Sequence, residues 1–195
     1  MKNLIFFSLI FLLLISCYKK SKETQNIEKY ETILTDEETY KEEFFIADNI
    51  KYPINTRNGI EDLFNKHYVN ITQEYLKEKL DEKSKKEYSN FKTRINNSLK
   101  EKINFGGKYL IIEWGCGTEC QTGVIINLED GKIFSLPTTE WGAEYKPNSL
   151  LFVANPPSVN NEYNINRPYY AYPRYYIWNK NKFDLICDTG NNEIK

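Results

Sequence analysis

The chain has 195 residues, and its 26 lysines and arginines against 27 aspartates and glutamates leave a formal net charge of −1 at pH 7. The two signs are interspersed along most of the sequence, which predicts no extended basic surface of the kind that nucleic-acid-binding proteins present to phosphates. We therefore expect no nucleic-acid partner. The length is enough for one domain with its own hydrophobic core.

The first residues have the pattern of a bacterial export signal. Lys2 supplies a positive charge, and the 12 residues from Leu4 to Ile15 are apolar except for Ser8. A helix that crosses a bilayer needs about 20 apolar residues, so this run is too short to span one comfortably. The run ends in Leu14-Ile15-Ser16-Cys17, which resembles the lipobox of bacterial lipoproteins.

The lipobox resemblance implies a signal peptide over residues 1–16 and a lipidated Cys17 that anchors the mature chain on a membrane of the bacterial cell envelope. The thiol would carry diacylglycerol, and the new amino group an acyl chain such as palmitate. Several chains are needed because each buried CH₂ contributes about 0.8 kcal/mol, and one chain alone anchors only marginally. Tyr18, rather than aspartate, follows the cysteine, which favours the outer membrane over the inner one in a diderm bacterium. An ordinary signal peptide or an uncleaved anchor with a chance cysteine is the alternative.

The rest of the chain divides into a tether and a domain. Residues 17–43 comprise the lipidated cysteine and a polar segment nearly free of glycine and proline, which is typical of a tether. Residues 44–195 are predicted to form a single α+β domain.

The domain is predicted to begin with helices. One apolar helix face is marked by Ile60, Leu63, Phe64, His67, Tyr68 and Ile71, which recur at helical spacing. A second, short helix is expected over 72–80. Ser84 and Glu87 match the S-x-x-E capping box, which predicts a helix over 85–102 that ends before Gly106 and Gly107.

From Tyr109 onward the pattern changes to β-branched and aromatic runs, which predict strands. These strands cover 109–114, 123–128, 133–135, 150–154, 174–178 and 183–186, and a short edge strand is expected over 49–54. Asp130-Gly131 is a hairpin signal between the second and third strands. Helices followed by an antiparallel sheet of five to six short strands indicate an α+β fold.

Two motifs resemble a family of small exported bacterial proteins of unknown function. Asn104-Phe-Gly-Gly-Lys-Tyr109 is similar to the family's N-F-A-G-H-Y, and Trp114-Gly-Cys-Gly-Thr-Glu-Cys120 is similar to its W-G-C-G-T-x-C. Later segments of the family appear here as Ser149-Leu-Leu151 and Tyr175-Tyr-Ile-Trp178, so the resemblance covers residues 85–187. Lys108 stands where the family has histidine. The resemblance implies a fold family and an exported setting, but no activity.

Cys116 and Cys120 lie between two predicted strands, and we expect them to form a disulfide that fixes a tight loop. A redox dithiol usually has two intervening residues and stands at a helix start. Zinc needs four ligands, for which only Cys187 and His67 remain. Redox chemistry, metal binding and pairing of Cys187 with either cysteine stay as alternatives. We expect no metal and no cofactor.

The sequence contains no recognisable catalytic set. His67 is the only histidine, and its apolar neighbours at helical spacing favour a packing role over catalysis. Four carboxylates lie near the W-G-C-G-T segment, namely Glu113, Glu119, Glu140 and Glu144. Two of them would suffice for an acid/base pair of the glycosidase kind, although a solvated or salt-bridged surface is the simpler interpretation.

The leading hypothesis is therefore a membrane-anchored, non-enzymatic domain that binds an envelope or extracellular protein or glycan. Its predicted ligand contacts are Trp114, Thr118 and Glu119 in the disulfide loop and Tyr169, Tyr170 and Tyr172 in an aromatic segment. Tyrosine and tryptophan combine apolar area with a polar tip, which suits binding surfaces. One alternative is an inhibitor of a cell-wall hydrolase, by analogy with small exported domains that carry a Cys-bounded loop. The other is an envelope hydrolase that uses the carboxylate pair.

Overall fold

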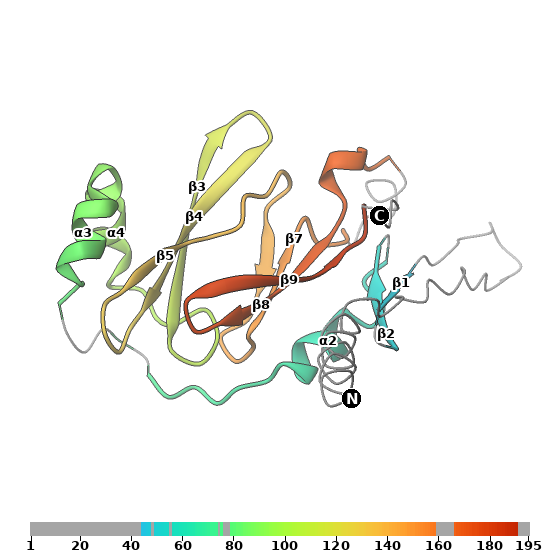
Figure 1. Cartoon of the computed structure of the whole chain (residues 1–195), viewed down its shortest axis with the longest axis horizontal. Coiled ribbons are helices and arrows are strands. Elements are labelled where there is room, and N and C mark those ends of the chain that lie inside the picture. Colours follow the sequence, from blue (N-terminus) through green and yellow to red (C-terminus); the bar gives the residue numbers. More distant parts are fainter. Residues whose placement is uncertain are drawn as a thin grey trace, which may run out of the picture.

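The structure is a computed structural model that describes residues 44–47, 49–54, 56–73, 75, 79–158 and 166–190 (Figure 1). The predicted signal peptide, the lipid-attachment residue Cys17 and the tether lie outside the described residues. Among the helices of the described segments, none is long and apolar enough to cross a membrane.

The strands of the domain form two main antiparallel sheets. The first contains β3 (Tyr109–Gly117), β4 (Cys120–Asn127) and β5 (Ile133–Ser135), in that order. The second contains β6 (Ala143–Tyr145), β7 (Leu151–Ala154), β8 (Arg174–Asn179) and β9 (Lys182–Asp188), also in that order. An α+β fold with antiparallel sheets is thus confirmed. The prediction of one sheet was wrong, because the chain leaves β5 after Ser135 and starts a second sheet at β6.

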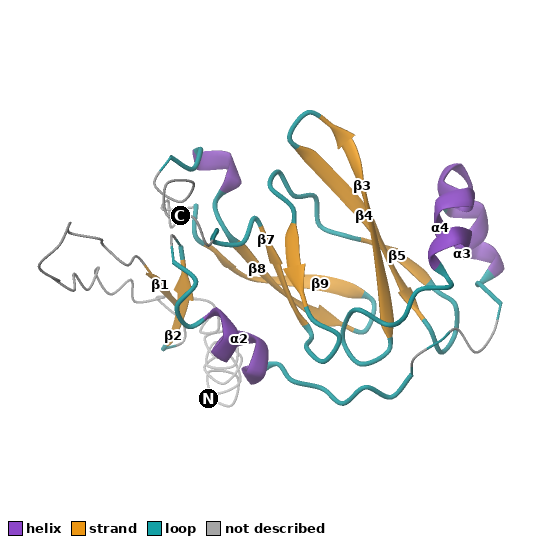
Figure 2. Ribbon diagram, turned by 180° about the vertical axis from the view of Figure 1, so that it is seen from behind, coloured by secondary structure: helices purple, strands orange, loops and turns teal. Residues whose placement is uncertain are grey.

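The two sheets pack face to face, and other elements cover their outer faces (Figure 2). Tyr109 and Ile111 of β3 share one buried cluster with Phe152 and Trp178 of the second sheet. The alternate residues of β3, beginning with Leu110, belong to a second cluster with residues of the helical segment. Because both faces of β3 are covered, Tyr109–Ile112 is a continuous buried run rather than an alternating one.

The described part contains three short α-helices, and they do not all precede the strands. A hairpin of β1 (Phe44–Ala47) and β2 (Ile50–Pro53) comes before α2 (Ile60–Lys66). Tyr52 of β2 and the apolar face of α2 cover the outer face of the second sheet, where they meet Leu151, Val153 and Tyr175. The edge strand expected over 49–54 is therefore confirmed as β2, whereas its partner β1 was not predicted.

The first predicted helix was too long. α2 ends at Lys66, and the chain then runs extended, with Tyr68 bridged to Ser149 and the amides of Thr72 and Gln73 donating to the Gly107 carbonyl. These main-chain hydrogen bonds to distant residues replace the intrahelical ones that the apolar spacing suggested. In the described part of 72–80, the expected short helix is also absent.

The second predicted helix is broken in the middle. α3 (Glu82–Glu87), the 3₁₀ turn η1 (Ser89–Phe91) and α4 (Lys92–Ser98) take its place. Asp81, rather than Ser84, is the N-cap, because its side chain accepts a hydrogen bond from the Ser84 amide at 2.9 Å. The Ser84 hydroxyl in turn accepts from the Ile133 amide at 3.2 Å, so α3 closes part of the free edge of β5.

The segment Asn104–Tyr109, the first motif of the family resemblance, is a buried structural turn. The Asn104 side chain donates to the Ile111 carbonyl at 2.9 Å and accepts from the Ile111 amide at 2.7 Å. Gly107 has φ +82°, and a Cβ there would lie 2.4 Å from the Asn70 carbonyl oxygen. The motif thus joins β3 to the extended segment after α2.

Candidate functional site

The β3–β4 hairpin projects beyond the body of the first sheet and ends in a disulfide-closed tip (Figure 1). Cys116 and Cys120 form the disulfide, with their Cα atoms 5.1 Å apart. The chain reverses through Thr118 and Glu119, and Glu119 adopts the left-handed conformation with φ 51°. Both residues are exposed, so the tip presents a short loop of fixed shape to solvent.

A second exposed loop carries the predicted aromatic contacts. Its 3₁₀ turn η2 (Tyr169–Ala171) leaves Tyr169 82% and Tyr170 43% exposed, while Ala171 is fully buried beneath them. Arg167 holds the turn in place, because its guanidinium donates to the carbonyls of Ala171 at 2.6 Å and Asn155 at 2.9 Å. Burial lowers the pKa of Arg167 to about 10.

The two loops touch although they are far apart in sequence. The Tyr170 hydroxyl donates to a carboxylate oxygen of Glu119 at 2.7 Å, across a separation of 51 residues. This hydrogen bond is also the main cause of the raised pKa of Tyr170. Together Thr118, Glu119, Tyr169 and Tyr170 make one exposed surface, which we call the tip surface.

A cleft of about 570 Å³ adjoins the tip surface through Gln121, the residue that follows Cys120. The half-buried Trp141 forms part of its wall, and the Arg167 guanidinium lies 4.8 Å from the centre of the Trp141 ring. Arg57 lines the cleft as well and is held by a bidentate ion pair with Glu144, at 2.7 and 2.8 Å. We call this concavity the Trp141 cleft.

Sequence reasoning missed the Trp141 cleft. Its residues come from five separate segments, and only the fold brings Arg57, Trp141 and Arg167 together. The one local signal was the aromatic residue in Glu140-Trp141-Gly142, a short polar and glycine-containing segment between predicted strands.

Two of the predicted contacts lie away from the tip surface. Trp114 is only 8% exposed and belongs to the cluster beneath the helices, where its ring stacks on Phe91 at 4.4 Å between centroids. Tyr172 is half-buried behind the aromatic turn, and its carbonyl accepts from the Asn155 amide group at 3.4 Å. Thr118, Glu119, Tyr169 and Tyr170 are therefore the predicted contacts that the fold assembles.

The four glutamates near the tip each have their own hydrogen-bond donor. Glu113 accepts from the Tyr145 hydroxyl at 3.0 Å, and Glu140 accepts from Asn155 and Arg174, each at 2.6 Å. Glu119 and Glu144 are bound by Tyr170 and Arg57, as described above. Burial raises the pKa of Glu113, with the Tyr145 hydrogen bond opposing that shift. None of these four glutamates lines the Trp141 cleft.

No family model, no curated protein and no solved structure matched this chain. The resemblance in the two motifs stays a prediction.

His67 and Cys187 both have structural surroundings. His67 follows the end of α2, where its carbonyl accepts from the Leu150 amide, and burial lowers the pKa of its imidazole. Cys187 is buried in the cluster with Tyr52 and Tyr175, and burial raises the pKa of its thiol. Because Cys116 and Cys120 are paired with each other, the alternative that Cys187 replaces one of them is wrong. Within the described segments, no group of three or more potential ligands could hold a metal ion.

Proposed function

We propose that this protein is an exported lipoprotein, anchored through Cys17 on a membrane of the bacterial envelope, whose domain is a non-enzymatic binding module. The observation that carries the proposal is the Tyr170–Glu119 hydrogen bond, which joins the disulfide-closed tip to the aromatic turn. This hydrogen bond joins the two loops into one exposed surface. The ligand is a glycan or a protein of the envelope or its surroundings.

The physical properties of the tip surface suit binding. Tyr169 and Tyr170 offer large aromatic area with few rotatable bonds, and the two rings support each other at 5.6 Å in an edge-to-face contact. The disulfide and the Tyr170–Glu119 bond hold the loops before a ligand arrives. A preorganised surface loses less conformational entropy on binding, so more of its contact energy appears as affinity.

A glycan is the first candidate because of the Trp141 cleft. A concave site with an aromatic wall and a few polar side chains is the usual form of a small-molecule site. Here the wall is Trp141, and Gln121 and Arg57 supply amide and guanidinium groups of the kind that bind hydroxyls. If one sugar ring occupied the cleft, the next ring of the same glycan would lie near the exposed tyrosines.

A protein ligand is the second candidate, with an inhibitor of a cell-wall hydrolase as its most specific form. The observation in its favour is the projecting tip itself, where Thr118 and Glu119 are exposed on a loop closed by a disulfide. Such a rigid convex loop has the shape that enters the cleft of another protein. The hydrolase alternative has no comparable support, since none of the four glutamates lines the Trp141 cleft.

The test is a titration of the purified full chain with soluble oligosaccharides from cell-wall glycan, followed by tryptophan fluorescence. The double variant Tyr169→Ala, Tyr170→Ala is expected to bind at least tenfold more weakly, because it removes both exposed rings. The matched control is Tyr68→Ala, Tyr75→Ala, which removes two tyrosines that are 56% and 51% exposed elsewhere. Equal loss in both variants would contradict the assignment of the tip surface.

A parallel measurement separates the two ligand classes. Loss of inhibition of a purified cell-wall hydrolase in the variant Thr118→Ala, Glu119→Ala, without any change in glycan binding, would favour the protein ligand. If the chain neither binds glycan nor inhibits such a hydrolase, both candidates fail.

The anchor has its own test, because mass spectrometry of the native N-terminus reports its chemistry directly. The expected result is an acylated cysteine at position 17 as the first residue, and an unprocessed chain for Cys17→Ser. An unmodified Cys17 or an intact Met1 would end the lipoprotein part of the proposal.

A further inference from the structure

The helical segment at one end of the molecule is strongly basic, in contrast to the chain as a whole. Between Glu82 and Lys102 the positive residues are Lys83, Lys85, Lys86, Lys92, Arg94, Lys100 and Lys102, and the negative ones are Glu82, Glu87 and Glu101. All ten are exposed. The segment therefore concentrates an excess of positive charge on a chain whose formal net charge is −1.

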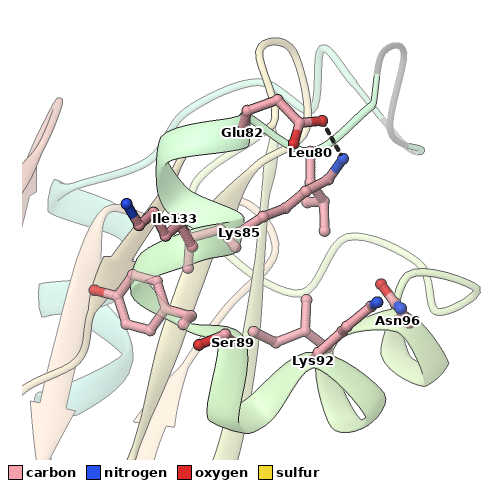
Figure 3. A pocket seen from close by; sticks show the side chains of 10 residues that line it. Leu80, Glu82, Lys85, Ser89, Lys92, Asn96 and Ile133 are labelled. Atoms are coloured by element: carbon pink, nitrogen blue, oxygen red, sulfur yellow. Dashed lines mark hydrogen bonds and ion pairs between the residues drawn. The ribbon is translucent and has the colours of Figure 1, made fainter.

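Three of these lysines surround a single pocket of about 590 Å³ (Figure 3). Lys85 and Lys86 come from α3, and Lys92 comes from the first turn of α4. Glu82 is the one carboxylate in the lining and is paired with Lys85 at 2.6 Å. Figure 3 shows this pair at one end of the pocket and Lys92 with Asn96 at the other.

The interior of the pocket is apolar. Leu80, Ile95 and Ile133 line it, and all three are buried side chains of the main core. The break between α3 and α4 creates this opening, because a continuous helix would not leave the space beside η1. The pocket thus combines a cationic rim with an apolar floor, which matches an anion that carries an apolar body.

An aromatic ring lies next to the same break. Phe91, the last residue of η1, is 39% exposed although it stacks on Trp114. Exposed aromatic residues beside lysines are typical of protein surfaces that rest on anionic membranes, where the ring enters the headgroup region.

We infer that this pocket, which we call the lysine pocket, binds the headgroup of an anionic phospholipid at the membrane surface. The phosphodiester would lie at the rim that carries Lys85, Lys86 and Lys92, and the glycerol and first methylenes would cover Leu80 and Ile133. Lysine ammonium groups bind phosphate as mobile point charges and need no fixed bidentate geometry. The site is separate from the tip surface and does not depend on the ligand proposed there.

The chain between the predicted anchor and the domain is long enough for this contact. α3 and α4 lie at the opposite end of the molecule from the β1–β2 hairpin, where the described chain begins (Figure 1). The 26 residues between Cys17 and Phe44 can span at most about 90 Å. A domain anchored at one end can therefore place its other end on the same membrane.

The test uses the full chain in nonionic detergent with monomeric short-chain lipid, so that the apolar N-terminal segment does not contribute. Dihexanoyl phosphatidylglycerol is the probe, and dihexanoyl phosphatidylcholine, inorganic phosphate and poly(glycerol phosphate) are the comparison ligands. Binding is followed by calorimetry at 50 and 500 mM salt. We expect phosphatidylglycerol to bind at least tenfold more tightly than phosphatidylcholine or phosphate at low salt, and to weaken at high salt.

The variant Lys85→Gln, Lys86→Gln, Lys92→Gln is expected to lose at least tenfold in phosphatidylglycerol affinity. The control Lys66→Gln, Lys180→Gln, Lys182→Gln changes as many exposed lysines outside the pocket and should bind as the unmodified chain does. Lys86→Arg, Lys92→Arg keeps the charge and should keep binding. Far-UV circular dichroism and the urea midpoint confirm that each variant is folded.

Three results would overturn the inference. Equal binding of phosphatidylcholine would show that charge plays no part, and equal binding of inorganic phosphate would show a free-anion site without a lipid. Tighter binding of poly(glycerol phosphate) than of phosphatidylglycerol would assign the pocket to an anionic polymer.

Discussion

Both ends of strand β3 are rich in glycine, but the segment before the strand is buried and the segment at its end is exposed. At its start, Asn104-Phe-Gly-Gly-Lys-Tyr109 forms a turn in which Gly106 and Gly107 are buried and bonded to distant main chain. At its end, Gly115-Cys116-Gly117 leads into an exposed tip. The turn at the start of β3 is thus held by contacts across the fold, whereas the tip at its end is exposed to solvent.

The atoms that surround each glycine decide whether a larger side chain can replace it. A Cβ on Gly107 would meet a main-chain oxygen that cannot move alone, whereas a Cβ on Gly115 has its nearest neighbour at 3.9 Å. Four measurements test the difference between the buried turn and the exposed tip.

The largest effect is expected for Gly107→Ala. The substitution places a methyl group against the Asn70 carbonyl and demands a positive φ that alanine disfavours, so we expect a loss of about 2–4 kcal/mol in unfolding free energy. Gly115→Ala is the matched change at the other end of β3, and it should stay within about 0.5 kcal/mol. Urea unfolding of both variants measures the difference, and similar losses would erase the distinction between the two ends.

A second large effect is expected for Asn104→Ala. The change removes both hydrogen bonds to the Ile111 main chain and leaves its amide and carbonyl unsatisfied in the core. Unsatisfied buried groups of this kind suggest a loss of about 2–3 kcal/mol. Thr118→Ala at the exposed tip should be neutral in the same urea experiment. A tolerant Asn104 would mean that the turn is held by its glycines alone.

The disulfide is expected to contribute less than either of these residues to stability. Closing a loop of five residues constrains the unfolded chain by only about 2 kcal/mol, and Cys116→Ser, Cys120→Ser should lower the unfolding free energy by that amount. Reduction of the unmodified chain should have the same effect, which is the control for the serine substitutions. Ligand binding at the tip surface should fall more steeply than stability does. A larger loss in stability than in ligand binding would show that the disulfide only stabilises the fold.

The smallest effect concerns Glu113, whose pKa is raised by burial. The native state keeps its proton at pH values where the unfolded chain has released it, so stability falls as the pH rises from the ordinary glutamate value through the raised pKa. Glu113→Gln should remove this fall and gain less than about 1 kcal/mol at pH 7, because solvent still reaches the half-buried carboxyl group. Thermal unfolding between pH 4 and 7 tests this, with the exposed Glu87→Gln as control. If Glu113→Gln leaves the pH dependence of stability unchanged, the Tyr145 hydrogen bond fully offsets the effect of burial on the pKa of Glu113.

The strands were the most predictable part of the fold. β-branched and aromatic runs located β3, β4, β7, β8 and β9 to within a few residues, and the Asp130-Gly131 signal located the turn before β5. β6 escaped because Ala143-Glu144-Tyr145 is short and has no distinctive composition. The helices were less predictable. α2 is followed by main-chain hydrogen bonds to distant residues, and α3 begins with the cap Asp81 and not with the predicted Ser84.

Part of the candidate site was also within reach of the sequence. The cysteine spacing and the tyrosine run identified the tip and the aromatic turn, but nothing local indicated that Tyr170 would reach Glu119. Trp114 was assigned to the site because of its position beside the cysteines. The alternation of strand side chains instead directs it to the core beneath α4.

Two local features of the domain could be read from the sequence alone, namely a disulfide within five residues and strands marked by their composition. These depend on neighbours along the chain, so local rules suffice. Only the tertiary structure decided that the strands form two sheets, that two loops share one surface, and that Arg57, Trp141 and Arg167 enclose a cleft. Such features depend on contacts between residues far apart in sequence, which form only when the sheets pack and bury their apolar faces.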